Sequence, residues 1–319
     1  MSLAERVISG DVRAAARLIT LLEDGSPEAL EEIDKLYPNT GRAYIIGVTG
    51  APGTGKSTLI DNLVSGFRHQ GKGVGVVAID PTSALTSGAL LGDRIRMQRH
   101  STDDQVFIRS LATRGWAGGL ARATLGTVRV MDALGKDIIM IETVGSGQVE
   151  LDIFRAADTT LAVLTPGSGD DIQMMKAGIL EVVDIIVVNK ADKEGADYLK
   201  SDLETMLAAA KRSGDKWVPP VVLTEATSNK GTEELNDVIF KHREYLFSGR
   251  GMEKHRRERV RLELLENIEG FVKDFTNIIK TTADFEIRVD DILKGRAVPR
   301  QAAEELINLL AERRQKEKG

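Results

Sequence analysis

The sequence predicts an α/β fold in which a doubly wound, mostly parallel sheet lies between helical N- and C-terminal extensions. Between residue 44 and about residue 247, short apolar runs rich in β-branched residues alternate with longer helical stretches, as in sheets covered on both faces by crossover helices. Helical periodicity precedes these runs, and no strand pattern follows them. We therefore expect a helical extension over residues 1–42, a sheet domain over 43–248 and a helical arm over 249–319.

The individual elements follow from caps, prolines and apolar runs. Asp11 and Gly25 bound a predicted helix, and Pro27 begins a second one. The β-branched runs predict strands over residues 44–48, 74–79, 138–141, 160–164, 185–188 and 221–223. Charged, helix-forming stretches near the C-terminus predict helices over residues 252–280, 289–293 and 299–318.

The composition is that of an ordinary globular protein, with 319 residues, 43 Lys and Arg against 48 Asp and Glu, and 42% hydrophobic residues. The formal net charge of −5 argues against broad electrostatic binding of nucleic acid. Without cysteine the chain has no disulfide scaffold, thiolate metal site or cysteine nucleophile, and its four histidines lack a zinc-like spacing. Because no apolar run approaches the ~18 residues that span a bilayer and residues 1–11 lack a signal-peptide core, we expect a cytoplasmic protein without a membrane partner.

The most specific motif is the phosphate-binding pattern G-x-x-x-x-G-K-[ST], which the chain matches without departure. With the next helical residue, the predicted phosphate-binding residues are Gly50, Ala51, Pro52, Gly53, Thr54, Gly55, Lys56, Ser57 and Thr58. The glycines allow backbone N–H groups to turn inward around phosphates, and the following helix adds its positive dipole end. Lys56 is predicted to reach the β- and γ-phosphates, and the Ser57 hydroxyl to bind Mg²⁺. The alternative, a glycine-rich turn with a chance lysine, is disfavoured by the strand before the motif and the helix after it.

A second motif, N-K-x-D over residues 189–192, ends a predicted strand and is typical of guanine recognition. The Asp192 carboxylate can accept from both N1–H and the exocyclic amine of guanine, which adenine does not offer in that arrangement, so the motif predicts GTP over ATP. Asn189 belongs to the same predicted site, and the stem of Lys190 is expected to lie over the base. After the next strand, a companion loop made of Thr224, Glu225 and Ala226 is expected to touch the base edge. A solvated helix-capping turn is the alternative interpretation of N-K-x-D.

Carboxylates follow two of the predicted strands. Asp80 and Glu142 end their strands, where side chains of parallel sheets face the ligand crevice, and Asp93 is a third candidate. Together with Ser57 they form the expected Mg²⁺ site, since Mg²⁺ takes oxygen ligands and keeps several waters. The alternative is that these acids cap the loops that follow them.

Taken together, these motifs resemble the MeaB/ArgK family of P-loop GTPases. The resemblance rests on residues 50–57, 80–83, 91–94, 142–148 and 189–192, and extends to residues 10–20, 113–119, 166–171 and 176–178. It implies a P-loop NTPase fold with a G domain of the SIMIBI type, a homodimer, and GTP and GDP with Mg²⁺ as ligands. It also implies a chaperone for an adenosylcobalamin-dependent acyl-CoA mutase, which gates cofactor loading and protects or reactivates the mutase. Methylmalonyl-CoA mutase is the favoured partner, and isobutyryl-, ethylmalonyl- and 2-hydroxyisobutyryl-CoA mutases remain open.

The resemblance also implies roles for individual residues. Lys56, Asp80, Asp93, Glu142 and Lys176 would form the catalytic and magnesium group. Lys176 would act from an additional switch over residues 165–176, which couples the partner to hydrolysis. Gln148 is a candidate for orienting the attacking water, and a switch-loop hydrogen bond is its alternative role.

Further implications concern the partner surface and the arm. The switch reads V-G-S-G-Q-V-E over residues 144–150, where many relatives have V-G-V-G-Q-S-E, so the choice of partner stays open. The arm is expected to make the dimer contact, with Val260, Leu264, Leu265 and Ile268 on one face. Two other functions remain to be weighed: a transport-associated kinase of the LAO/AO type, and a nickel-insertion GTPase. The absence of cysteine and the scattered histidines disfavour the second.

Overall fold

The computed structural model describes residues 1–80, 98–100, 102–112, 117–143, 157–167, 183–209, 217–249 and 251–316. The chain forms two compact units, Met1–Glu263 and Leu264–Gly319. Among the described residues, no helix is both long enough and apolar enough to cross a bilayer.

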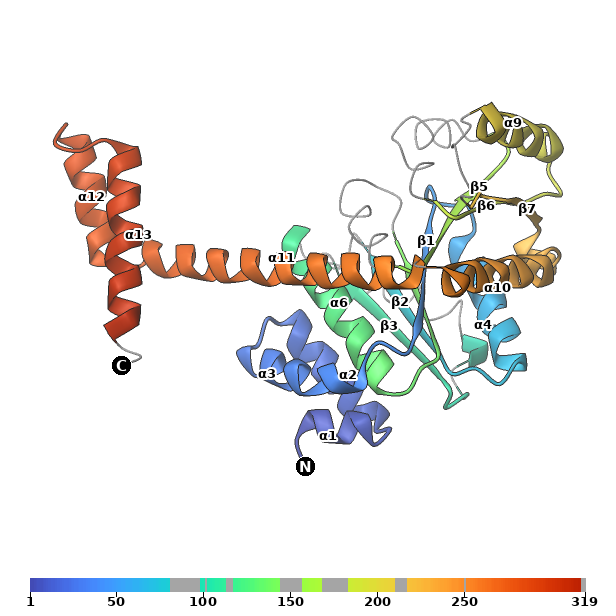
Figure 1. Ribbon diagram of the computed structural model, residues 1–319, viewed down its shortest axis with the longest axis horizontal. Helices are drawn as coiled ribbons and strands as arrows, with labels where there is room; N and C mark the ends of the chain where they lie inside the picture. The colour runs from blue at the N-terminus through green and yellow to red at the C-terminus, as the bar shows by residue number, and fades with distance from the viewer. Residues whose placement is uncertain are drawn as a thin grey trace. The chain divides into compact units, whose positions relative to one another are not determined.

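The first unit is built on a seven-stranded sheet with the order β3-β2-β4-β1-β5-β6-β7 (Figure 1). Its strands are β1 (Tyr44–Thr49), β2 (Val74–Asp80), β3 (Val106–Ala112), β4 (Ile138–Glu142), β5 (Thr159–Leu164), β6 (Ile185–Asn189) and β7 (Val221–Thr224). Each pairing between described strands is parallel. The doubly wound parallel fold is therefore confirmed, and the carboxyl ends of all these strands share one edge with β1 at its centre.

The edge strand β3 was missing from the predicted elements. Its sequence, VFIRSLA, mixes buried Phe107 and Leu111 with the polar residues Arg109 and Ser110, so it lacks the continuous apolar run of the central strands. Arg109 forms an ion pair with Glu23 and donates to the Thr20 hydroxyl at 3.0 Å. A partner 86 residues away in the sequence thus accommodates the charge, and no local pattern could reveal that contact.

Helices cover both faces of the sheet (Figure 1). On one face, α1 (Leu3–Ile8), α2 (Val12–Glu23), α3 (Pro27–Leu36) and α6 (Ala117–Ala133) share a core with Ile45, Val77 and Ile139. On the other, α4 (Lys56–His69) and α10 (Thr232–Ser248) pack against Ile46, Val76 and Met140. A third cluster lies between α9 (Ala196–Ala209) and strands β5, β6 and β7. Neighbouring residues such as Ile45 and Ile46 face opposite layers, as the period of a strand requires.

The N-terminal helices begin and end as their sequence predicts. The Asp11 carboxylate caps α2 by accepting from the backbone N–H groups of Arg13 and Ala14 at 2.9 and 3.0 Å. Gly25 follows the helix with a φ of +69°, and Pro27 occupies the first turn of α3. Since their apolar side chains complete one face of the sheet, these helices and the strands share one core.

The second unit contains the later part of α11 (Gly251–Lys280), together with α12 (Ala283–Leu293) and α13 (Pro299–Lys316). The hydroxyl of Thr282 caps α12 by accepting from Phe285 N–H at 3.3 Å, so this helix begins six residues before the predicted start at 289. Phe275, Ile279, Phe285 and Leu306 form its small core. An ion pair of 2.9 Å between Arg288 and Glu305 joins α12 to α13.

Candidate nucleotide-binding site

The phosphate loop joins the end of β1 to the start of α4, in the strand–loop–helix context that its motif requires. Two of its glycines lie too close to neighbouring segments to carry a Cβ. Gly50 has a φ of +151°, and a Cβ there would lie 2.3 Å from the Val163 carbonyl oxygen. Gly55 has a φ of +92°, and a Cβ there would lie 2.4 Å from Asn189 Nδ2. The loop therefore passes close to both β5 and the end of β6, which only glycine permits.

The Lys56 ammonium lies inside the turn of this loop. Lys56 is 7% exposed, and its Nζ donates to the carbonyl oxygens of Gly50 at 2.7 Å and Ala51 at 3.1 Å. The hydroxyl of Thr54 also donates to Ala51, at 2.9 Å. A buried positive charge is thus fixed where the motif places the phosphates of a nucleotide.

Two predicted magnesium ligands lie together at the carboxyl edge of the sheet. The Ser57 hydroxyl donates to Glu142 Oε1 at 2.7 Å, and both residues are buried. Asp80 ends the neighbouring strand β2, two residues beyond Ala78, which is the register partner of Glu142. A hydroxyl and a carboxylate are hard oxygen donors of the kind that Mg²⁺ prefers, so this pair fits the ion. Within the described part of the chain no group of three or more acidic or histidine side chains could hold a metal on its own.

Asn189 connects the base loop to the phosphate loop. Its amide Nδ2 donates to the Thr54 carbonyl at 2.7 Å. Its Oδ1 accepts from the Thr224 hydroxyl and from the Ala226 backbone N–H, each at 3.1 Å. Because Asn189 is only 2% exposed, these three bonds satisfy a buried amide and hold three segments in register.

Lys190 makes a second connection of the same kind. It adopts a φ of +58°, which is uncommon outside glycine, and its Nζ donates to the Gly53 carbonyl at 2.7 Å. Its aliphatic stem therefore runs from the end of β6 to the phosphate loop. Asp192, two residues later, is exposed at the same edge, and Ala191 N–H donates to the Thr224 carbonyl at 3.0 Å.

The companion loop after β7 is tightly fixed. Lys230 and Ser228 donate to Glu225 Oε2 at 2.9 and 2.8 Å, and these bonds hold the pKa of the Glu225 carboxyl below its usual value. The Ala226 carbonyl accepts from Asn62 Nδ2 at 2.6 Å. Gly231 closes the loop at a φ of +75°, and a Cβ there would lie 2.1 Å from the Leu223 carbonyl oxygen.

The structure therefore brings together the phosphate loop, Glu142, the base motif and the companion loop at one edge of the sheet. The side chain of Asp80 and the whole of Asp93, Gln148 and Lys176 lie outside the described residues. Sequence reasoning missed Asn62 and Gly231, which hold the companion loop. The only signal for Asn62 was a polar residue on the buried face of α4, and that does not reveal its partner.

Comparisons with known proteins agree with this geometry. A family model described as methylmalonyl-CoA mutase-associated GTPase MeaB matches residues 15–279. A putative GTPase of Pyrococcus abyssi is 50% identical over 307 residues, covering 96% of this chain and 95% of its own. The GTPase ArgK of Escherichia coli is 32% identical over 237 residues, covering 72% of each chain. A crystal structure of an LAO/AO transport system kinase shares the fold, with a TM-score of 0.69 at 23% identity over 97% of this chain and 96% of that one.

Proposed function

This chain belongs to the MeaB family of P-loop GTPases, and we propose that its GTP hydrolysis is magnesium-dependent and gates cobalamin loading into an adenosylcobalamin-dependent acyl-CoA mutase. In the same role it would protect or reactivate the mutase, with methylmalonyl-CoA mutase as the partner that the family description favours. The observation that carries the proposal is the hydrogen-bonded connection from the base motif to the phosphate loop through Asn189.

Hydrolysis depends first on the buried ammonium of Lys56. Two of its acceptors, the carbonyls of Gly50 and Ala51, are neutral, whereas phosphate oxygens are charged and make stronger charge-assisted bonds. We expect the ammonium to exchange these carbonyls for β- and γ-phosphate oxygens, where it stabilises the charge that develops as the terminal phosphate leaves. The backbone N–H groups of the loop orient the same phosphates.

Ser57 and Glu142 are the described residues that would hold Mg²⁺, and Asp80 and Asp93 are the further proposed ligands. The bound ion would neutralise charge on the β- and γ-phosphates. Before that, the 2.7 Å bond between Ser57 and Glu142 fixes the hydroxyl at the carboxyl end of β4. Lys176 and Gln148 are proposed, from the family resemblance alone, to act on the γ-phosphate and on the attacking water.

Guanine recognition is proposed to centre on Asp192. The carboxylate is exposed at the edge where β6 and β7 end, beside the fixed companion loop. Asn189 and Lys190 support it by tying the end of β6 to the phosphate loop, and Thr224, Glu225 and Ala226 supply the neighbouring edge of the base site. Once a bound base covers Asp192, an acceptor left without guanine donors would cost about 1–3 kcal/mol, which is enough to disfavour adenine.

A homodimer is proposed through the C-terminal unit. Leu264, Ile268 and Val272 recur at helical spacing along α11 and are 60%, 47% and 59% exposed, with Leu265 and Phe271 beside them. So many large apolar side chains along one helix are unusual for a surface that stays in water. A second copy of the chain is the occupant we propose for this stripe.

The proposal is tested by measuring GTP turnover with and without methylmalonyl-CoA mutase, using GTP labelled on the γ-phosphate. We expect stimulated release of free phosphate by the wild-type chain, and none by Lys56→Ala. Asp192→Asn should lose preference for GTP over ATP in the same assay. Absence of both stimulation and complex formation with every acyl-CoA mutase tried would refute the chaperone role, and label on an acceptor molecule would support the kinase alternative.

A further inference from the structure

We infer that Asn62 and Arg99 position the companion loop at Thr224–Ala226, and so determine how the site reads the carbonyl edge of the base. Neither residue belongs to a nucleotide-binding motif. The inference rests on the proposed base site, and it concerns the edge next to the one assigned to Asp192.

The Ala226 peptide is held from both sides. Its carbonyl accepts from Asn62 Nδ2 at 2.6 Å, and its N–H donates to Asn189 Oδ1 at 3.1 Å. Asn189 continues to the Thr54 carbonyl at 2.7 Å. A single chain of hydrogen bonds therefore runs from α4 through the companion loop and the end of β6 into the phosphate loop.

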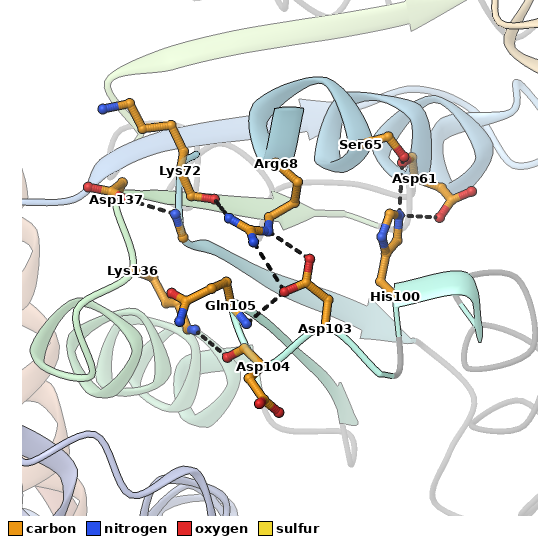
Figure 2. A network of polar contacts seen from close by, with 11 residues as sticks. Asp61, Ser65, Arg68, Lys72, His100, Asp103, Asp104, Gln105, Lys136 and Asp137 are labelled. Carbon is orange, nitrogen blue, oxygen red and sulfur yellow. Dashed lines mark hydrogen bonds and ion pairs between the residues drawn. The ribbon is translucent and has the colours of Figure 1, made fainter. Parts of the chain in front are cut away.

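Arg99 fixes the orientation of the Asn62 amide. The guanidinium Nη2 donates to Asn62 Oδ1 at 2.9 Å and lies 2.7 Å from Asp61 Oδ2. Arginine has donors only, so the amide must turn its oxygen toward Arg99 and its Nδ2 toward the Ala226 carbonyl. The neighbouring His100 Nε2 lies 2.9 Å from Asp61 Oδ1, and Figure 2 shows this pair at the α4 helix. These contacts form the Asp61 clasp, which consists of Asp61, Asn62, Arg99 and His100.

A second clasp, further along the same helix, provides an internal comparison. Arg68 donates to Asp103 at 2.8 and 3.2 Å, and Asp103 also accepts from Gln105 N–H at 2.9 Å (Figure 2). It joins α4 to the same stretch of chain, since Asp103 lies three residues after His100. Arg68 bonds to Asp103 and to the Lys72 carbonyl, and Asp103 accepts from Gln105, so these bonds stay outside the companion loop. A general anchoring role can therefore be separated from the positioning of that loop.

The reason the companion loop matters for the base lies in the guanine edge next to the one assigned to Asp192. Guanine presents N1–H and its amine to the Asp192 carboxylate, and its O6 lies next to N1, where a donor is needed. The companion loop lies next to the loop that carries Asp192. A hydrogen bond joins the two loops, because Ala191 N–H donates to the Thr224 carbonyl. In the structure the Glu225 and Ala226 N–H groups of this loop donate to the Lys230 carbonyl and to Asn189 Oδ1. O6 would therefore share the Ala226 donor, and that sharing requires the loop position that the Asn62 bond to the Ala226 carbonyl provides.

The substitution Asn62→Asp tests this at nearly constant shape. The new oxygen faces the Ala226 carbonyl without a donor, while the other oxygen still accepts from Arg99. We expect the affinity for GTP to fall about tenfold, the loss of roughly one buried hydrogen bond. The affinity for the 2-aminopurine riboside triphosphate, which lacks both O6 and the N1 proton, should fall less than twofold. Binding of inorganic tripolyphosphate should not change.

Three companions make the test decisive. Arg99→Gln, at a half-exposed position, should lower the preference for GTP over the 2-aminopurine riboside triphosphate by a smaller factor than Asn62→Asp. Asp103→Asn, which removes the charge of the second clasp alone, should leave this preference as in the wild type. Asp192→Asn should alter the preference for GTP over ITP, which lacks the amine.

The inference is overturned if Asn62→Asp lowers the affinities for GTP, the 2-aminopurine riboside triphosphate and tripolyphosphate by the same factor. It is also overturned if Asn62→Asp and Arg99→Gln both leave the preference for GTP over the 2-aminopurine riboside triphosphate unchanged. If Asp192→Asn still changes the GTP-over-ITP preference in that case, the proposed base site stands and only the role of Asn62 and Arg99 fails. If Asp192→Asn has no effect, the base site itself is wrong.

Discussion

Replacing Asn189 by alanine should weaken both the fold and nucleotide binding, because this one amide joins three segments. The change removes three hydrogen bonds. In one, Asn189 Nδ2 donates to the Thr54 carbonyl, and in the other two Oδ1 accepts from the Thr224 hydroxyl and from the Ala226 N–H. All of these groups belong to buried residues, so water cannot readily replace the amide.

The magnitude follows from those three bonds. At about 1 kcal/mol of net stability for each, Asn189→Ala should lower the free energy of unfolding by about 3 kcal/mol. For a unit of this size that corresponds to a fall in Tm of roughly 6 to 12 °C. Asn189→Asp keeps both bonds to Oδ1 and loses only the one to Thr54, but it places an oxygen against a carbonyl, so it should cost about 1–3 kcal/mol.

Thermal unfolding by circular dichroism and titration with a fluorescent GDP analogue measure the two effects. Nucleotide affinity should fall roughly 10- to 100-fold with alanine, corresponding to about 1.4–2.8 kcal/mol. GDP should therefore raise the Tm of the variant less than that of the wild type at equal concentration. An alanine variant with unchanged Tm and unchanged affinity would refute the reasoning, since it would mean that the three bonds hold nothing.

The remaining predictions concern the metal, the pH dependence and the arm. Glu142→Gln keeps an acceptor for Ser57 but removes the charge, so the Mg²⁺ concentration for half-maximal GTP hydrolysis should rise roughly 10- to 100-fold, and an unchanged value would exclude Glu142 from the metal site. Burial lowers the pKa of His242 from 6.5 to about 4, so the unfolded chain binds the proton first. The contribution of His242 to the free energy of unfolding is therefore present above pH 6.5 and is lost as the pH falls toward 4. At pH 5 the loss should be about 2 kcal/mol. Urea unfolding above pH 6.5 and at pH 5 measures this loss, and His242→Gln should make the free energy of unfolding depend less on pH. The double change Leu264→Glu and Ile268→Glu should give monomers in analytical ultracentrifugation while the GTPase unit keeps its Tm, and a persistent dimer would exclude the stripe as the contact.

The sequence was sufficient for the sheet interior because its strands are apolar on both faces. Ile45 and Ile46 pack into opposite layers, and such runs are recognisable without knowing their partners. The edge strand β3 was not recognisable, because the partners of Arg109, Glu23 and Thr20, lie on α2 and no local pattern reveals them. The start of α12 was placed too late because charged residues alternate with the apolar ones over Ala283–Arg288, and the cap at Thr282 decides the boundary.

The same distinction applies to the site. Residue type and spacing identify groups that act on a ligand, so the phosphate loop and the N-K-x-D motif could be located from the sequence. The residues that hold those groups in place have no such signature. Asn62 and Ala226 are 164 residues apart, and Asn62 and Arg99 are 37 apart, so their bonds exist only once the sheet has brought the segments together.

These connections bear on how the site can work as a switch. Asn189 and Lys190 bond to the Thr54 and Gly53 carbonyls, so the segment proposed to read the base and the loop proposed to hold the phosphates share their position. A network of this kind resists partial displacement, because moving one member leaves buried polar groups of the others without partners. We therefore expect base and phosphate binding to be energetically coupled, so that the effect of a substitution in one site does not simply add to the effect of a substitution in the other. A nucleotide that fits both ends is expected to gain bonds at both, whereas one that fits only its phosphates gains none at the base end.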